Sequence, residues 1–361
     1  MTLPTDEPKD YAIGVAPLPD ILQENLPTEP QYYDNTRLVD FKECPRKYYL
    51  RHIRGWRGKG TAMPLVFGLS WHDAMDYLWS RYNQESESEL LVGAAKAFHE
   101  RWISEGLKPA GELNIDDIER LGARTPMVAA EMMYHYLQSR KKIFDRADFQ
   151  LEAVEQPFAV PIFPNRPNVW YIGRLDKVFN YNGSRIVGEH KTTSEYKKEG
   201  GFKQQYLESW SPNSQIEGYM YAANLYFPGG ARQVWLDASL VHKKEHEFFK
   251  FIPISASMAG LDEWLYDTRH WINRVEQESR TLQELVSAAS DPALWAFPRN
   301  TNSCSGKYGM CTYVEVCRNV RNPAQLIEPP EGFIEDRWMP FDVLQIGKLG
   351  LPPEEVSKNN G

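Results

Sequence analysis

The sequence predicts an α/β or α+β domain built around a mixed β-sheet, and three observations support this prediction. Predicted helices, strands, a further helix and further strands follow one another along the chain. Asn182-Gly183 separates two apolar strands, and it is the dipeptide preferred in type I′ hairpin turns, because both of its positions need positive φ. The chain has 361 residues, of which 42% are hydrophobic, so it is able to bury a substantial core as one elaborated domain or two.

The elements are expected in the following order. Thr36 is the candidate N-cap of a short helix that ends at Glu43, and Pro45 precedes a basic, aromatic helix at 46–54. Hydrophobic periodicity predicts the remaining helices, at 69–82, 90–104, 126–144, 213–227 and 257–280. Strands are expected at 150–162, 169–180, 185–192, 232–242 and 246–253. The stretch between the helices at 90–104 and 126–144 is interpreted as an insertion.

Composition divides the chain into a core domain at 35–325 and two flanking segments. Residues 1–34 are proline-rich and acidic and are predicted to be an extension that is ordered only if it docks, while residues 326–361 form a proline-rich tail. No apolar run approaches the ~20 residues that span a bilayer, and the first residues lack the features of a secretory signal. These observations predict a cytoplasmic protein without a membrane partner.

The formal net charge is −8, which argues against a protein whose whole surface is built to hold nucleic acid. A local cationic track remains compatible with that charge. The best candidate interleaves cations with tyrosine, histidine and tryptophan, and its DNA-binding candidates are Arg46, Lys47, Arg51 and Arg54. The alternative is an ordinary solvated helix face.

Three charged residues stand in the two strands of the predicted hairpin, where a sheet normally buries aliphatic side chains. Asp176 lies in the first strand, and Glu189 and Lys191, two residues apart, project from one face of the second. Two acids and a lysine on one buried face are costly unless a divalent cation and an anionic ligand lie among them. A metal ion that bridges a phosphate meets this requirement. The alternative is a surface hairpin with solvated charges, but apolar flanking residues favour burial.

The four cysteines predict a second metal site. Cys304, Cys311 and Cys317 lie in one short segment with the spacing C-x6-C-x5-C, and Cys44 lies about 260 residues upstream. Four thiolates suit either a tetrahedral zinc ion or a four-iron cluster, and the spacing alone does not separate these two possibilities. Such a site would join the N-terminal region to the C-terminal region.

Several of these motifs together resemble a known family. Asp176 followed by Glu189-His190-Lys191 resembles the D…E-x-K signature of the PD-(D/E)XK nuclease superfamily. Three further segments resemble its RecB-like branch, which includes AddB-type, CRISPR-associated and exonuclease V-like members with an iron–sulfur cluster. These segments are Gly68-Leu69-Ser70-Trp71-His72, Gln215-Ile216-Glu217-Gly218-Tyr219, and Cys44-Pro45-Arg46-Lys47-Tyr48 with the three distant cysteines.

The resemblance implies a restriction-endonuclease-like core and specific roles. Asp176 and Glu189 are the expected carboxylate ligands of Mg²⁺ or Mn²⁺, with His72 and the backbone carbonyl of His190 as further ligands. Lys191 is expected to act on the attacking water, and Gln215 and Tyr219 to support Lys191 or the DNA strand. Cys44, Cys304, Cys311 and Cys317 are expected to hold a [4Fe–4S] cluster, with structural zinc as the alternative.

The function implied by the resemblance is a metal-dependent DNA nuclease. The expected enzyme is an exonuclease that acts on single-stranded DNA or DNA ends in recombination, repair or phage DNA processing. The sequence contains no G-x-x-x-x-G-K-[ST] motif, so any helicase would be a separate partner. Two alternatives are a non-catalytic DNA-end-binding subunit of a recombination or CRISPR spacer-acquisition complex, and a zinc-stapled structural protein.

Overall fold

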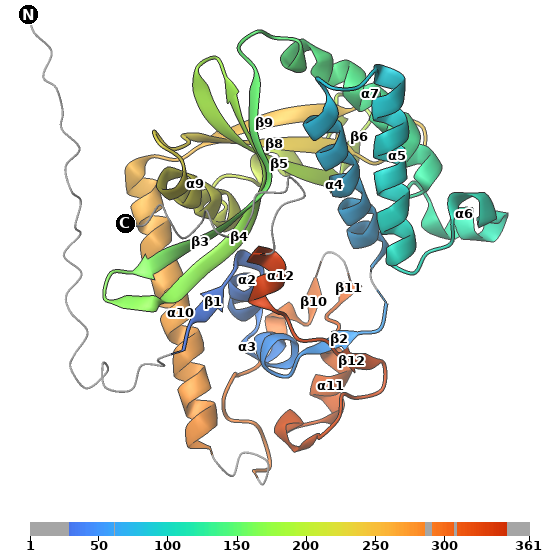
Figure 1. Cartoon of the computed structure of the whole chain (residues 1–361). Coiled ribbons are helices and arrows are strands. Elements are labelled where there is room, and N and C mark those ends of the chain that lie inside the picture. The colour runs from blue at the N-terminus through green and yellow to red at the C-terminus, as the bar shows by residue number, and fades with distance from the viewer. Residues whose placement is uncertain (1–28, 61, 286–290, 307–308, 345–361) are drawn as a thin grey trace, which may run out of the picture.

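The computed structural model describes residues 29–60, 62–285, 291–306 and 309–344 (Figure 1). Most of the predicted N-terminal extension, residues 1–28, and the last part of the predicted tail, residues 345–361, lie outside the described residues.

A six-stranded mixed sheet forms the centre of the fold, in the order β1-β4-β5-β8-β9 with β3 paired to the other edge of β4. The β1–β4 and β5–β8 pairs are parallel, whereas β3–β4, β4–β5 and β8–β9 are antiparallel. The strands are β1 (Gln31–Tyr33), β3 (Gln150–Phe163), β4 (Arg166–Tyr181), β5 (Ser184–Thr193), β8 (Gln233–Leu240) and β9 (Phe249–Ser255). The prediction of a mixed central sheet is confirmed.

The long strand β4 has two different partners along one edge. Its C-terminal half pairs with β5 from Lys177 to Tyr181, and its N-terminal part pairs with β1 from Val169 to Tyr171. The strands β5 and β1 therefore diverge beside residues 172–176 of β4. The hairpin turn at Asn182 and Gly183 has φ values of 53° and 70°, which is the geometry that an Asn-Gly type I′ turn requires.

Helices cover both faces of the sheet (Figure 1). One face carries α4 (Met63–Arg81), α5 (Glu87–Ser104) and α7 (Pro126–Phe144), whose apolar residues form one core with Phe179, Ile186 and Trp235 of the sheet. The other face carries α9 (Ser214–Tyr226) and α10 (Met258–Glu284), which pack in a second and larger core. The short helices α6 (Ile115–Leu121) and α8 (Gln204–Glu208) and the hairpin of β6 (Tyr196–Lys197) and β7 (Gly201–Phe202) lie in the connections.

A smaller region combines the two ends of the described chain. It contains α2 (Asn35–Glu43), α3 (Pro45–Tyr48) with the π-helical turn Tyr49–Ile53, β2 (Trp56–Gly58), β10 (Ser305–Gly306), β11 (Gly309–Met310), α11 (Val314–Asn319), β12 (Phe333–Glu335) and α12 (Pro340–Leu344). The strands β2 and β12 pair antiparallel, and Tyr313 donates a hydrogen bond to the carbonyl of Trp56 at 2.6 Å. The N-terminal and C-terminal segments therefore fold as one unit.

Several local expectations differ from the structure. Residues 31–33 of the predicted extension form β1 of the central sheet, and the helix expected at 69–82 begins earlier, as α4. The N-cap of α2 is Asp34, whose carboxylate accepts from the amide of Arg37 at 2.7 Å, and Thr36 is already inside the helix. The stretch after residue 325, interpreted as a tail, contributes β12 to a sheet and places α12 against β4. The strand β12 and the position of α12 depend on long-range packing that the local pattern does not show, whereas the cap at Asp34 is a local contact.

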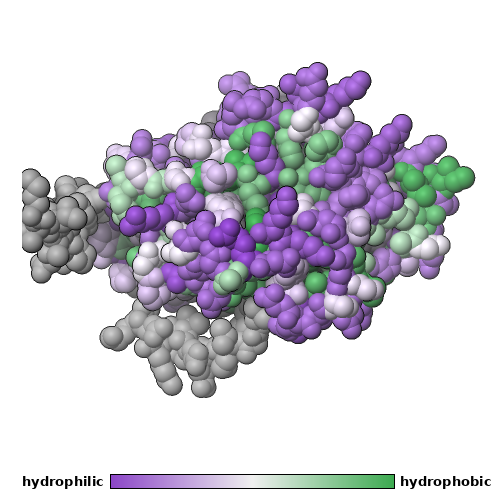
Figure 2. All heavy atoms as spheres, turned by 90° about the horizontal axis from the view of Figure 1, so that it is seen from above, coloured by the Kyte–Doolittle hydropathy of each residue, from purple (hydrophilic) through white to green (hydrophobic). Residues whose placement is uncertain are grey.

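Seen from above, the surface is mostly hydrophilic, with apolar groups in small separate patches (Figure 2). Within the described residues, no helix has both the length and the apolar character that crossing a membrane requires.

Candidate functional site

Asp176 occupies the point where β4 leaves β5. The last ladder pair at this end joins Lys177 to Gly188, so the amide of His190 has no backbone acceptor in the ladder opposite it. The Asp176 Oδ2 atom takes that place and accepts the His190 amide at 2.8 Å. The carboxylate thereby completes the edge of the hairpin and is fixed in position, only 7% exposed.

Glu189 and Lys191 project from one face of β5, as their two-residue spacing predicts. This face is turned toward α9. The Lys191 ammonium donates a short hydrogen bond to Glu189 Oε1. Gln215 of α9 donates to the same oxygen at 3.2 Å and to the hydroxyl of Tyr219 at 2.9 Å. The structure therefore brings together four of the predicted residues. Lys191 and Gln215 both donate to Glu189, and Tyr219 lies one turn further along α9.

His72 approaches the cluster from the other side. It lies on α4, and its Nδ1 is 3.3 Å from Asp176 Oδ2. The start of α4 lies close to the end of β5, since a Cβ on Gly68 would be 3.6 Å from the hydroxyl oxygen of Thr192. Burial lowers the pKa of His72 and keeps the imidazole neutral, which is the form that binds metal ions.

The two carboxylates have opposite pKa shifts. Burial together with the neighbouring charge of Asp176 raises the pKa of Glu189 to about 8. Burial alone would also raise the pKa of Asp176, but His72, Lys177 and Lys191 hold it below the usual value. Burial lowers the pKa of Lys191 less than the Glu189 and Asp176 charges raise it, so its ammonium remains protonated. The nearby cations therefore do not fully offset the negative charge of the two carboxylates, and a bound divalent cation would offset it.

The chemistry of these donors fits a hard divalent cation. Glu189 Oε2 is buried and has no hydrogen-bond partner. One carboxylate oxygen is therefore available at the fork, the point where β4 and β5 separate beyond the Lys177–Gly188 pair. Carboxylate oxygens with a single imidazole suit Mg²⁺ or Mn²⁺. Within the described residues, no three His, Cys, Asp or Glu side chains are already arranged around one metal position.

The side chain of His190 lies on the opposite face of the sheet from Glu189 and Lys191. It is 1% exposed, packs edge-on against Trp79, and has its Nδ1 3.5 Å from Asp237 Oδ2. Both ring nitrogens lack hydrogen-bond partners. Any contribution of His190 to the site in front of the sheet would therefore come from its backbone.

A buried ion pair directly behind the cluster was not expected from the sequence. Lys177, which follows Asp176, is 0% exposed, and its ammonium donates to Asp76 Oδ1 at 3.1 Å. Asp76 lies one helical turn after His72 on α4. The signal was present, because Lys177 occupies an apolar face of the hairpin and Asp76 continues the His72 face, but each needed the other to be interpreted.

The basic residues proposed to bind DNA are held by other parts of the protein. Arg46 is 5% exposed and donates to the carbonyls of Phe297 and Leu294, and Arg54 donates to those of Pro323 and Leu326. Lys47 and Arg51 both pair with Asp40. In this structure these four cations connect the N-terminal segment to its surroundings, and a role in DNA binding stays a prediction.

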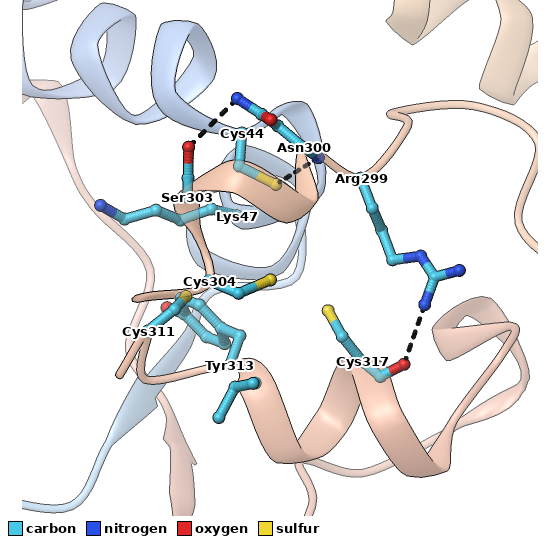
Figure 3. Close-up of a pocket in the computed structure, with 10 residues that line it drawn as sticks. Cys44, Lys47, Arg299, Asn300, Ser303, Cys304, Cys311, Tyr313 and Cys317 are labelled. Carbon is cyan, nitrogen blue, oxygen red and sulfur yellow. Dashed lines mark hydrogen bonds between the residues drawn. The ribbon is translucent and has the colours of Figure 1, made fainter. Parts of the chain in front are cut away.

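The four cysteines line one pocket in the smaller region, although they come from distant parts of the chain. All four are free thiols. The sulfur atoms of Cys44, Cys304 and Cys317 turn toward the same space, and Cys311 lies at its edge (Figure 3). The amide of Asn300 donates to Cys44 Sγ at 3.3 Å, and Arg299 donates to the carbonyl of Cys317 at 3.2 Å.

Comparison with known proteins assigns the chain to a family. The model of the PD-(D/E)XK nuclease superfamily matches residues 35–318, which include the hairpin, α4, α9 and all four cysteines. The chain belongs to the PD-(D/E)XK nuclease superfamily. No curated protein sequence matches the chain.

Two solved structures are similar to parts of the chain. A protein from Eubacterium rectale, provisionally described as an exonuclease, is 14% identical, with 68% of this chain and 80% of that chain covered and a TM-score of 0.40. The protein SSO0001 is also 14% identical, with 64% and 84% covered and a TM-score of 0.23.

Proposed function

We propose that this protein is a metal-dependent deoxyribonuclease that hydrolyses phosphodiester bonds, acting as an exonuclease on single-stranded DNA or on DNA ends. The observation that carries this proposal is the fork between β4 and β5. There Asp176, Glu189 and Lys191 converge, with one buried oxygen of Glu189 free of partners. Membership of the PD-(D/E)XK nuclease superfamily supports the same conclusion.

Each residue of the cluster has a distinct part in the proposed reaction. Asp176, Glu189 and His72 would hold Mg²⁺ or Mn²⁺, with the His190 carbonyl as a further ligand. A divalent ion bound there supplies an activated water and offsets charge on the scissile phosphate. Lys191, released from Glu189, would orient that water or stabilise the negative charge that develops on the phosphate.

Gln215 and Tyr219 have a supporting part. Gln215 donates to Glu189 Oε1, the same oxygen that Lys191 contacts, and is itself close to the Tyr219 hydroxyl. The amide therefore orients the Glu189 carboxylate through Oε1 and leaves Oε2 without a hydrogen-bond partner. This positioning makes α9 part of the proposed active centre.

We further propose that the protein belongs to the RecB-like branch and that Cys44, Cys304, Cys311 and Cys317 hold a [4Fe–4S] cluster, with zinc as the alternative. The donor set fits, because four free thiols line one pocket and Asn300 directs an N–H toward one of the sulfurs. The proposed contribution of the cluster is structural. It would bind segments that are about 260 residues apart.

The proposed activity is tested with end-labelled single-stranded DNA and protein in Mn²⁺ or Mg²⁺. Wild-type protein should degrade the DNA, EDTA should stop the reaction, and Lys191→Ala should reduce the rate by about 10²–10³-fold, the scale for loss of one transition-state donor. Lys250→Ala is the matched control, because this lysine is exposed and stands on the edge strand β9, two strands away from β5. Its rate should equal that of wild type.

Two other outcomes would overturn the proposal. If wild type and Lys191→Ala bind DNA equally and neither cleaves it, the protein is a non-catalytic end-binding subunit. Equal cleavage by both proteins would place the active site elsewhere. The pattern of labelled products from an active wild type distinguishes exonuclease from endonuclease action. Recombination, repair or phage DNA processing, with any helicase supplied by a separate chain, is the proposed setting.

A further inference from the structure

Arg124 is a half-buried cation without a counter-charge. It lies in the connection between α6 and α7, and its guanidinium donates a single side-chain hydrogen bond, to the hydroxyl of Ser194 at 3.2 Å. No ion pair joins Arg124 to a carboxylate within the part of the chain that the structure describes. Burial lowers the pKa of Arg124, and no neighbouring acid offsets this effect. A guanidinium that is partly removed from water and has no acid beside it is available to bind an anion from outside the protein.

A second cation, from another loop, lies beside the same connection. Lys243 lies in the connection between β8 and β9, and its Cε would be 3.7 Å from a Cβ on Gly122, two residues before Arg124. Lys243 is exposed, and in the described residues it too has no carboxylate within ion-pair distance. Gly122 has a φ of 65°, a conformation that favours glycine, and a Cβ there would make only an ordinary van der Waals contact with Lys243.

The sheet brings these groups to the candidate active site. Strands β5 and β8 are parallel, so the segments that follow them leave from the same edge of the sheet. The amide of Val241 donates to the carbonyl of Thr193 at 2.7 Å, which holds the two segments together directly before Ser194. Ser194 is three residues beyond Lys191, a path of about 10 Å at ~3.3 Å per residue. Ser194, with the Arg124 guanidinium bonded to it, therefore follows Lys191 at this edge of the sheet, and Lys243 lies on the segment that follows the adjacent strand β8.

We propose that Arg124 and Lys243, with the hydroxyl of Ser194, bind a backbone phosphate of the substrate strand close to the phosphate that is cleaved. This inference rests on the nuclease function proposed above. A guanidinium, an ammonium and a hydroxyl together match the several oxygens of a phosphodiester. Arg124 lies in the stretch between α5 and α7 that is interpreted from the sequence as an insertion, so this stretch would contribute to substrate binding.

Substrate binding in EDTA tests the inference independently of cleavage. The affinity for a labelled single-stranded oligonucleotide is measured by fluorescence anisotropy over a range of salt concentrations. Arg124→Gln and Lys243→Gln should each weaken binding by about tenfold and lower the slope of log affinity against log salt, and the double variant should lower that slope by about 0.7, the value for one phosphate contact on a single strand. Arg124→Lys keeps the charge and should retain most of the slope.

Two matched controls are available in the same loops. Arg120 lies four residues before Arg124 but pairs with Asp117, and Lys244 neighbours Lys243 in the exposed connection. Arg120→Gln and Lys244→Gln should bind like wild type. In the cleavage reaction, Arg124→Gln should raise KM with a small change in kcat, because the contact is made before and during the reaction alike.

The failure of this inference differs from the failure of the proposed function. Wild-type affinity and wild-type salt slope in both Arg124→Gln and Lys243→Gln would overturn the inference, whether or not the protein cleaves DNA. A protein that fails to cleave but loses slope in both variants keeps the phosphate site and loses the nuclease. Equal losses in the Arg120 and Lys244 controls would also overturn it, since the effect would then belong to general surface charge.

Discussion

Asp40 shows how single buried carboxylates organise the charges of this protein. It is 3% exposed and contacts Lys47 at 2.8 Å, Arg51 at 3.0 Å and His52 at 2.8 Å. Burial alone would raise the pKa of Asp40, but the hydrogen bond from His52 and the charges of Arg51 and Lys47 hold it below the usual value. Asp40 therefore stabilises the turn that follows Cys44.

Replacement of Asp40 with asparagine should lower the free energy of unfolding at pH 7 by about 1–3 kcal/mol, the scale for hydrogen bonds to charged groups. Because the pKa of Asp40 is lowered in the folded protein, its contribution is complete above its unfolded pKa of ~3.9 and is lost as the pH falls through the lower folded value. Urea unfolding at pH 7 and near pH 3 measures this. A difference between wild type and variant that grows toward acid pH would contradict the account.

At the residue scale, the sequence was informative where partners are close in the chain. Asp176, Glu189 and Lys191 belong to one hairpin, so the turn at Asn182 and the two-residue alternation place them together. Arg46 and Arg54 have the same local appearance as a basic track, but their acceptors are carbonyls about 250 and 270 residues away. Local composition has no information about such partners.

At the scale of elements, α4 is joined to the hairpin at two points one turn apart. His72 contacts Asp176, and Asp76 contacts Lys177. Asp176 and Lys177 are adjacent in β4, so their side chains leave the strand on opposite faces. Lys177 is 0% exposed and its ammonium also lies 5.5 Å from the centre of the Trp79 ring. The buried pair thus fixes the helix that carries His72 relative to the strand that carries Asp176.

Asp76→Asn should lower the free energy of unfolding by about 3–5 kcal/mol, because it leaves the Lys177 charge buried without its partner. The double variant Asp76→Leu with Lys177→Met should recover much of that loss, since it removes both charges. Asp73→Asn is the control on the same helix, because its partner Arg101 is partly exposed, and it should cost less than ~1 kcal/mol. A double variant less stable than Asp76→Asn would contradict this interpretation of the pair.

The elements themselves were predicted best where a long periodic pattern defines them. The helix at 126–144 begins and ends where expected, with Thr125 as its N-cap and Pro126 in its first turn. The predicted strands at 150–162 and 185–192 agree with β3 and β5 within one residue at each end. In contrast, β12 and α12 are short, and they depend on pairing with β2 and packing on β4. Their local sequence carries too little periodicity to indicate them.

At the scale of the whole molecule, the cysteine pocket joins segments from both ends of the described chain. Glu43 and Cys44 receive hydrogen bonds from Asn300 and Ser303, and β2 pairs with β12. A cluster bound to the four thiols would add covalent links to this region. The spacing of the cysteines predicted that the two ends meet, whereas the non-covalent contacts around them were not visible in the sequence.

Cys311→Ser should therefore reduce iron content, solubility and thermal stability more than it reduces the specific activity of protein that remains folded. Iron analysis and thermal melting of purified protein measure this. Met310→Ser is the matched control, because Met310 neighbours Cys311 and is 54% exposed, and it should behave like wild type. Full stability together with nuclease activity in iron-free and zinc-free protein would contradict a structural metal site.

Calorimetric titration of Mn²⁺ into wild-type protein and into Glu189→Gln most directly tests whether the fork between β4 and β5 is a metal centre. Wild type should bind Mn²⁺ at this site, and Glu189→Gln should weaken that binding by at least tenfold, because it replaces the carboxylate whose Oε2 is buried without a partner. Lys191→Ala should still bind Mn²⁺. Equal Mn²⁺ affinity in wild type and Glu189→Gln would contradict the assignment of the metal centre.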